Sequence, residues 1–208
     1  AIADTHFGSK YCAEEEFGEF INYAYSLGVR TVVHAGDMLA GLLNHHGMVY
    51  EIKQVGFDNQ TDAALAALPQ KEGLHYYFID GNHDLNSFQK TIGMSPGKAL
   101  IRKALEQGRH DLHYCGPTQG RIVFGQDPER NIKMELAHPK ASQNTYAQSY
   151  PLQRWVERMQ GGAKPHILIS GHLHSYSVLD IRSVICCQPG CFEFQTPFGQ
   201  EHGLQPAV

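Results

Sequence analysis

Residues 74–84 read LHYYFIDGNHD, an apolar run that ends in a group of polar side chains. The residues up to position 79 are typical of a buried strand, which ends at Asp80-Gly81-Asn82-His83-Asp84. Similar arrangements occur at four more places: residues 1–3 precede Asp4-Thr5-His6, residues 31–35 precede Gly36-Asp37, residues 132–137 precede His138, and residues 166–170 precede Gly171-His172-Leu173-His174. Binding sites in α/β sheets collect at the carboxyl ends of strands, so we expect these five polar groups to converge.

Helices and strands alternate in the first half of the chain. The spacing of apolar residues predicts helices within residues 13–27, 62–68, 99–107 and 152–159. The second half is richer in short β segments, around residues 112–114, 121–124, 177–181 and 183–187. This order predicts an α/β fold with a mixed sheet or two stacked sheets.

The composition is that of a globular protein with a mild acidic excess. The chain has 208 residues, of which 42% are hydrophobic and 18% charged, enough for one domain with a sizeable core. Its 17 Lys and Arg and 21 Asp and Glu give a net charge of −4, which argues against a general polyanion-binding surface. No apolar run approaches the roughly 18 residues that span a bilayer, so we expect no association with a membrane.

The five cysteines do not indicate a disulfide framework, because their number is odd and the chain is long. The cluster Cys186-Cys187-x3-Cys191 lacks a second pair of ligands at the spacing of a zinc site. No signal peptide is recognisable. We therefore expect reduced thiols and a cytoplasmic protein.

Histidine is unusually abundant, with 13 residues against 17 Lys and Arg together. The strand-end groups combine imidazole, carboxylate and carboxamide side chains, which ligate divalent cations such as Mn²⁺, Fe²⁺ or Zn²⁺. There are too many of them for one ion, and they would suit two ions that share a carboxylate. Two such ions, roughly 3.5–4 Å apart, clamp a phosphate oxygen and supply a bridging hydroxide that attacks phosphorus in line. A histidine outside the ligand set would then assist the leaving group.

The order of these groups resembles the five sequence blocks of the calcineurin-like metallophosphoesterases. The blocks are Asp4-x-His6, Gly36-Asp37, Gly81-Asn82-His83-Asp84, His138-Pro139 and Gly171-His172-x-His174, which together cover residues 4–174. Two further segments, Thr145-Tyr146-Ala147 and Gln195-Thr196-Pro197-Phe198, are similar to a phage- and prokaryote-associated branch of phosphoesterases. The chain differs from many members at Ala40, where an Asp or Asn is common.

The resemblance implies a fold and a role for each matching residue. The fold would be two stacked mixed β-sheets flanked by helices, an α/β/β/α sandwich formed by residues 1–208 as a single domain that lacks residues at both ends. Asp37 would bridge the two metals, and His83 would assist the leaving group with its ring oriented by Asp84. The remaining ligands would be Asp4, His6 and His174 for the first metal, and Asn82, His138 and His172 for the second.

Several other polar residues allow two interpretations, one functional and one structural. Asn44-His45-His46 follows the Gly-Asp loop and would either contact the substrate or form a solvated loop, with equal weight. His34 is expected as a strand residue hydrogen-bonded beneath the site. We expect Lys10 and Lys140 to be exposed, although either would attract phosphate. For Tyr146 and Tyr150, packing within the protein is favoured over stacking on a nucleobase.

These observations predict a metal-dependent phosphoesterase that hydrolyses phosphodiesters of nucleotides or nucleic acid. The expected cofactors are two divalent ions, Mn²⁺ first, with Fe, Zn or Ni as alternatives, and the expected partner is a phosphoester substrate such as a nucleotide or DNA. The alternatives are a phosphomonoesterase acting on nucleotides or proteins, and a catalytically silent metal-bearing scaffold. A DNA-polymerase accessory subunit is a further class, which would normally need an additional oligonucleotide-binding domain.

Overall fold

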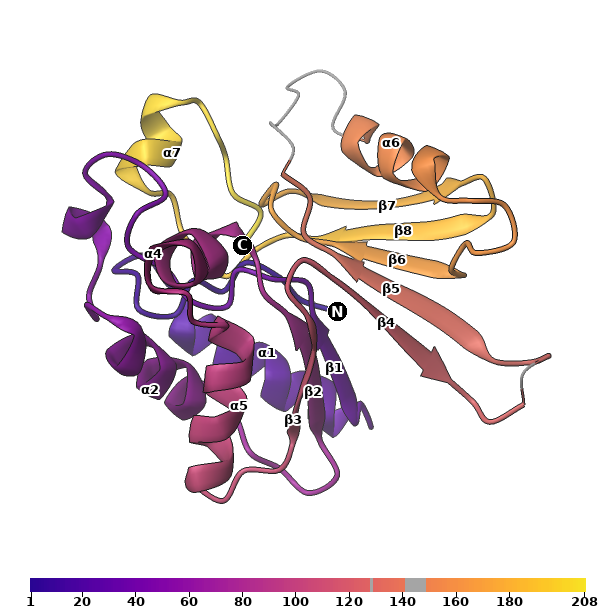
Figure 1. The fold of residues 1–208 in the computed structure, drawn as a ribbon, viewed down its shortest axis with the longest axis horizontal. Helices are drawn as coiled ribbons and strands as arrows, with labels where there is room; N and C mark the ends of the chain where they lie inside the picture. Colours follow the sequence, from indigo (N-terminus) through magenta and orange to yellow (C-terminus); the bar gives the residue numbers. More distant parts are fainter. Residues whose placement is uncertain (128, 141–148) are drawn as a thin grey trace.

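The computed structural model describes residues 1–127, 129–140 and 149–208, which form two β-sheets between layers of helices (Figure 1). The smaller sheet is parallel, with the strand order β1 (Thr31–His34), β2 (His75–Ile79), β3 (Leu112–Gly116). The larger sheet is mixed, with the order β4 (Gln119–Phe124), β5 (Ile132–Ala137), β6 (Ile167–Ser170), β8 (Val184–Pro189), β7 (Tyr176–Ile181). The expected α/β fold of two stacked sheets flanked by helices is confirmed.

Helices and short helical turns connect the strands. In chain order they are α1 (Glu14–Ser26), the 3-10 turn η1 (Met48–Glu51), α2 (Phe57–Ala67), α3 (Asn82–Asp84), the π-helical turn η2 (Leu85–Gln89), α4 (Lys90–Ile92), α5 (Pro96–Glu106), α6 (Tyr150–Arg158) and α7 (Pro197–Glu201). The first turn of α1 carries Glu14, Glu15 and Glu16, whose charges favour the positive end of the helix dipole. Among the described residues, no helix is long and apolar enough to cross a membrane.

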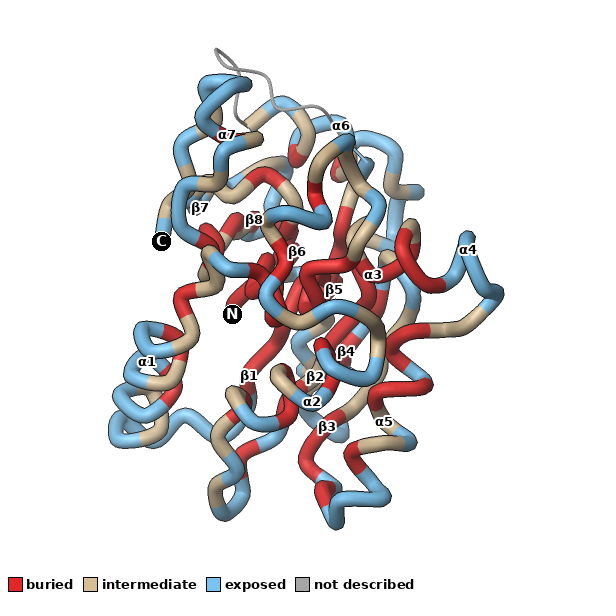
Figure 2. Tube along the Cα trace, turned by 90° about the vertical axis from the view of Figure 1, so that its left-hand side faces the viewer, coloured by how far each residue is buried: buried red, intermediate tan, exposed pale blue. Residues whose placement is uncertain are grey.

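Three of the hydrophobic clusters among the described residues join the four layers. The first joins the helices α1, α2 and α5 to the smaller sheet, through residues such as Phe17, Leu100 and Phe78. The second lies between the two sheets, where Ile79 meets Leu136. The third packs α6 against the larger sheet (Figure 1), and its members are Ala137, Leu152, Val156, Leu168, Val184 and Cys186. Figure 2 shows the buried residues following the strands and the inner faces of the helices.

The layering brings the carboxyl ends of several strands together. β1 and β2 run parallel in the smaller sheet, and β5 and β6 run parallel in the larger one. The N-terminal residues extend the smaller sheet beside β1, because Ile2 forms a parallel bridge with His34. Each of these segments therefore delivers its polar group to the same edge of the sandwich, as the sequence predicted.

Candidate metal centre

The backbone at this edge has an unusual conformation. Seven non-glycine residues of the described chain have positive φ angles, and two of them, Arg182 and Ser183, form the turn between β7 and β8. The other five are expected metal ligands: Asp4 (52°), His6 (48°), Asp37 (55°), His172 (87°) and His174 (50°). Such conformations cost on the order of 1–3 kcal/mol each and persist where the surrounding structure enforces them. The fold therefore holds these side chains on strained loops, as is typical of functional sites.

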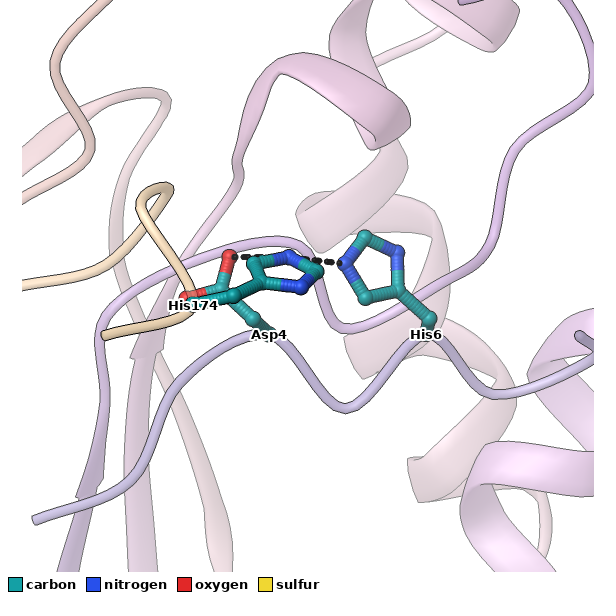
Figure 3. Close-up of side chains that lie close together, drawn as sticks. All are labelled: Asp4, His6 and His174. Atoms are coloured by element: carbon teal, nitrogen blue, oxygen red, sulfur yellow. Dashed lines mark hydrogen bonds and ion pairs between the residues drawn. The ribbon is translucent and has the colours of Figure 1, made fainter. Parts of the chain in front are cut away.

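Asp4, His6 and His174 form the first group of convergent side chains (Figure 3). The Nε2 atoms of His6 and His174 lie 3.0 Å apart, and Nε2 of His174 lies 3.7 Å from Oδ1 of Asp4. Both carboxylate oxygens of Asp4 accept from the backbone N–H of His172, at 3.0 and 2.9 Å. The Asp4 carboxylate is thereby fixed between the segments that carry His6 and His174.

Asp37, His138 and His172 form the second group. Nε2 of His138 lies 3.2 Å from Oδ2 of Asp37 and 3.0 Å from Oδ1 of Asn82, while its Nδ1 is 2.8 Å from the carbonyl oxygen of Ala35. Because a carbonyl only accepts, Nδ1 donates this hydrogen bond, which turns Nε2 toward the carboxylate of Asp37. The amide oxygen of Asn82 points into the same space as the ligand atoms.

Asp37 links the two groups, since it also clusters with His6 and His83. Burial alone would raise the pKa of its carboxyl, but His138 and His83 hold that pKa well below its usual range. Burial alone would lower the pKa of His138, but Asp37 raises it to about 9. Asp37 is therefore held as a charged carboxylate in a buried position, as a shared metal ligand would be.

The first group has the opposite electrostatic character. Burial lowers the pKa of His6 well below its ordinary value and the pKa of His174 to about 3, helped by neighbouring imidazoles. Both imidazoles are therefore neutral near pH 7, the form in which histidine ligates a metal. Nδ1 of His6 is buried without a hydrogen-bond partner in the described part of the chain. The donor set of carboxylate, carboxamide and neutral imidazole fits a divalent metal ion.

Two glycines allow the loops to approach this closely. A Cβ atom at Gly81 would lie 2.0 Å from Oδ1 of Asp37, and one at Gly36 would lie 2.4 Å from Nδ1 of His138. Distances below 3.0 Å would require the ligand side chains to move. The glycines of the Gly36-Asp37 and Gly81-Asn82 motifs are thus required by the packing of the ligands themselves.

His83 lies beside the ligands with one ring nitrogen directed at Asp37. Its Nε2 is 4.0 Å from Oδ2 of Asp37, and its backbone N–H donates to Oδ1 of the same carboxylate at 2.7 Å. Its Nδ1 is 2.7 Å from the carbonyl oxygen of Ala40, so Nδ1 donates the hydrogen bond that orients the ring. The side chain is partly exposed, and it lines a cavity of about 380 Å³.

The expectation that Asp84 orients the His83 ring is corrected by these contacts. Asp84 instead accepts from the backbone N–H groups of Leu39, at 3.0 Å, and Gly81, at 2.8 Å. Ala40 takes over the orienting role through its carbonyl group. Asp84 therefore joins the loop that carries Asp37 to the loop that carries Asn82.

The remaining predicted residues are placed differently from one another. Asn44 and His45 line the cavity, whereas His46 is exposed and is not among the described residues that line it. Nε2 of His34 is 3.0 Å from Oγ1 of Thr5, which confirms a hydrogen-bonded strand residue beneath the site. Lys10, Lys140 and Tyr150, which also allowed two interpretations, are exposed. Tyr146 lies outside the described residues.

Sequence reasoning missed Glu193, a buried carboxylate at the edge of the first group. Its Oε2 lies 3.8 Å from Nε2 of His6, and burial raises its pKa to about 7. It is not preceded by an apolar strand that ends in a polar group, which was the pattern that revealed the other residues. Its available signal was a lone acidic residue between two aromatic ones, Phe192 and Phe194.

The chain is similar to one curated protein and to several solved structures. No family model matches the sequence. Over 99% of its length the chain is 24% identical to the DNA polymerase II small subunit of Methanothermobacter thermautotrophicus, and it spans about half (49%) of that relative. Similar solved structures include an archaeal phosphodiesterase (14% identity, 91% of this chain and 81% of that chain, TM-score 0.49) and the nuclease MPE of Pseudomonas putida (15% identity, 94% and 73%, TM-score 0.41).

Both of these solved structures are less than 25% identical to the chain, with TM-scores below 0.5. The resemblance to the calcineurin-like phosphoesterases rests on the order of the sequence blocks and on the convergence of their Asp and His residues in the fold. The activity and partners of the chain itself are matters for a proposal, since the identities are low and the curated relative is about twice as long.

Proposed function

We propose that this chain is a metal-dependent phosphoesterase that hydrolyses phosphodiester bonds of nucleotides or nucleic acid. The single observation that carries the proposal is the convergence of two ligand groups on the buried carboxylate of Asp37, with His83 beside it at the mouth of a cavity. The ligand groups would hold two divalent ions, with Mn²⁺ as the first candidate and Fe, Zn or Ni as alternatives. One group would comprise Asp4, His6, Asp37 and His174, and the other Asp37, Asn82, His138 and His172.

When bound, the metals would polarise the phosphate and lower the pKa of a water molecule at the site. The protein's part is to position the substrate and to manage protons. The hydrogen bond from Nδ1 of His83 to Ala40 directs Nε2 toward the cavity. In the protonated form, Nε2 of His83 would donate its proton to the departing alkoxide oxygen, as a general acid.

The charges around the cavity support a diester rather than a monoester substrate. Glu51 and Glu193 line the cavity in addition to Asp37, and Glu193, whose pKa burial raises to about 7, carries part of a negative charge at that pH. A phosphomonoester carries about −1.5 to −2 charges near pH 7, whereas a diester carries one, so the acidic lining disfavours the monoester more. A phosphomonoesterase is the alternative that a side-by-side assay would reveal.

The test compares Mn²⁺-dependent hydrolysis of bis(p-nitrophenyl) phosphate with that of p-nitrophenyl phosphate. Asp37→Ala should abolish hydrolysis, because it removes the carboxylate shared by both groups. His83→Ala should lower turnover while metal content, measured by elemental analysis of the purified protein, stays close to that of the wild type. Unchanged turnover in Asp37→Ala would refute the proposal, and loss of metal in His83→Ala would refute the role given to His83. Tyr23→Ala, on the exposed face of α1, is the matched control.

A second candidate is supported by the similarity to a DNA polymerase small subunit, which extends over nearly the whole chain. In this case the phosphoesterase would act as part of a larger assembly that processes DNA. Exonuclease assays on primed and unprimed DNA would test it, and no degradation of either substrate would refute it. We also propose a cytoplasmic location, which the five cysteines without disulfide bonds support.

A further inference from the structure

The cavity beside the metal centre extends well beyond the ligands. One wall is formed by the ligand side and includes His83, His172 and His174. Much of the remaining lining comes from two segments far apart in the sequence, residues 44–52 and residues 193–206, the second of which contains α7. Its volume of about 380 Å³ falls within the roughly 300–1,000 Å³ of small-molecule sites. A phosphate at the metals would therefore leave room for one attached group.

Three rings pack together across these two segments. The ring of His45 stacks on that of Phe198 at 4.3 Å with an interplanar angle of 19°, and Phe198 packs on His202 at 4.2 Å. Glu51 holds His45 from its other end, with 3.7 Å between Oε2 and Nε2. These three rings form a fixed stack that joins the two segments. Both faces of Phe198 are thereby occupied.

Phe194 is the cavity-lining ring that is available to a ligand. It is 44% exposed, and it has no ring contact with another described residue. It follows Glu193 directly in the chain, and Glu193 lies 3.8 Å from His6. Because Phe194 lines the same cavity as His83, His172 and His174, its ring would meet a group attached to a bound phosphate. Stacking of a base on an aromatic side chain is sequence-tolerant and favourable.

The charge of the cavity is unsuited to a polynucleotide. None of the described residues that line it is Lys or Arg, whereas Glu51 and Glu193 both line it. Nucleic acids are held chiefly through their phosphates by Lys and Arg, and each additional phosphate here would meet a carboxylate instead. The cavity therefore favours a substrate with one phosphate and an uncharged attached group.

Asn44, which lines the cavity, is held in place by a hydrogen bond from η2. The side-chain amide oxygen of Asn44 accepts from Nδ2 of Asn86 at 2.8 Å, but Nδ2 of Asn44 is buried without a partner in the described part of the chain.

The geometry points to a nucleoside subsite: a pocket formed by residues 44–52 and 193–206 that binds the uncharged, planar aromatic group of a small phosphodiester. The preferred substrate is then a diester with a single phosphate and one nucleoside, and not a DNA or RNA strand. This inference rests on the proposed function for the chemistry, but the binding of a nucleoside to the pocket does not depend on it.

The test uses two diesters that release the same p-nitrophenol, thymidine 5′-(p-nitrophenyl phosphate) and methyl p-nitrophenyl phosphate, with Mn²⁺ present. Stacking predicts that kcat/KM for the thymidine ester exceeds that for the methyl ester by about five- to a hundredfold. Phe194→Leu should reduce this ratio by about fivefold or more, while Phe194→Trp, which keeps a stacking face, should retain it. Tyr23→Leu replaces an aromatic residue that is 65% exposed on α1 and serves as the control.

Binding of thymidine alone is measured by calorimetry on the wild type and Phe194→Leu, so that the pocket is tested even without turnover. Hydrolysis of neither diester, with thymidine bound and weakened by Phe194→Leu, would refute the proposed function and support the nucleoside subsite. Equal kcat/KM for both diesters, or no binding of thymidine, would overturn the subsite. A ten-residue oligothymidylate cleaved with higher kcat/KM than the thymidine ester would overturn it as well.

Discussion

The connection that Asp84 makes between two ligand loops leads to a quantitative prediction. Its carboxylate accepts from the backbone N–H groups of Leu39 and Gly81, both of them buried. Asp84→Ala leaves both donors unsatisfied, at roughly 1–3 kcal/mol each, so the free energy of unfolding should fall by about 2–6 kcal/mol. Asp84→Asn keeps one acceptor oxygen and should lose about half as much.

Removal of the Asp84 charge has a stabilising effect that acts against the loss of hydrogen bonds. Burial and the nearby charge of Asp37 raise the pKa of Asp84 to about 7, so a neutral side chain relieves part of that repulsion. Both variants remove this charge repulsion, whereas Asp84→Ala loses both hydrogen bonds and Asp84→Asn loses only one. The Ala variant should therefore be less stable than the Asn variant, whatever the size of the relief.

Urea unfolding, followed by circular dichroism in the presence of a chelator, measures these differences. The matched control is Asp58→Ala, whose side chain is 89% exposed and whose removal should change the stability by no more than about 0.5 kcal/mol. Metal affinity of Asp84→Asn should fall by about 10–100-fold, because residues that support ligands typically have effects of this size. An Asp84→Ala protein as stable as the control, or equal stability of the Ala and Asn variants, would refute the reasoning.

Three further predictions concern packing and metal binding. Arg109→Leu should destabilise the protein by about 3–5 kcal/mol in urea unfolding, because it leaves Asp111 buried without its bidentate partner, and a loss below 1 kcal/mol would contradict this. Gly81→Ala should weaken Mn²⁺ binding in calorimetry, since its Cβ would displace the Asp37 carboxylate, and wild-type affinity would show that the loop adjusts freely. Mn²⁺ at about 100 times its Kd should stabilise the wild type by about 2.7 kcal/mol, a rise in Tm of roughly 5–10 °C. If Mn²⁺ raises the Tm neither of the protein as purified nor of protein first stripped with a chelator, a metal site is contradicted.

Much of the fold and the position of the site could be predicted from the sequence. The apolar runs that end at Asp37 and Asn82 identified strands, and parallel strands place their carboxyl ends at one edge, so the convergence of the polar groups followed from the pattern. Contacts made by backbone atoms could not be predicted in this way. The carbonyl of Ala40 orients His83, and a carbonyl group is the same in every residue.

The part of the cavity lining formed by residues 44–52 and 193–206 could not be predicted from the sequence pattern either. Glu193 and Phe194 lie in an irregular segment, where neither helical nor strand periodicity indicates which side chains turn inward. The stack of His45 on Phe198 joins residues that are more than 150 positions apart, and their meeting depends on the packing of the whole edge. Asn44 and His45 were therefore candidates with two readings until the tertiary structure placed them in the cavity.

The left-handed backbone at five of the expected ligands has a consequence for protein design. In Asp4-x-His6 and His172-x-His174, two left-handed residues flank a single residue, so that the chain turns back and forth over three positions. Grafting the same side chains onto regular strands or helices would not reproduce their directions, because the handedness of each turn sets where the side chain points. A transplanted centre would have to carry whole loops with their neighbouring glycines, and a search for such centres in other proteins could begin from backbone angles before any side chain is considered.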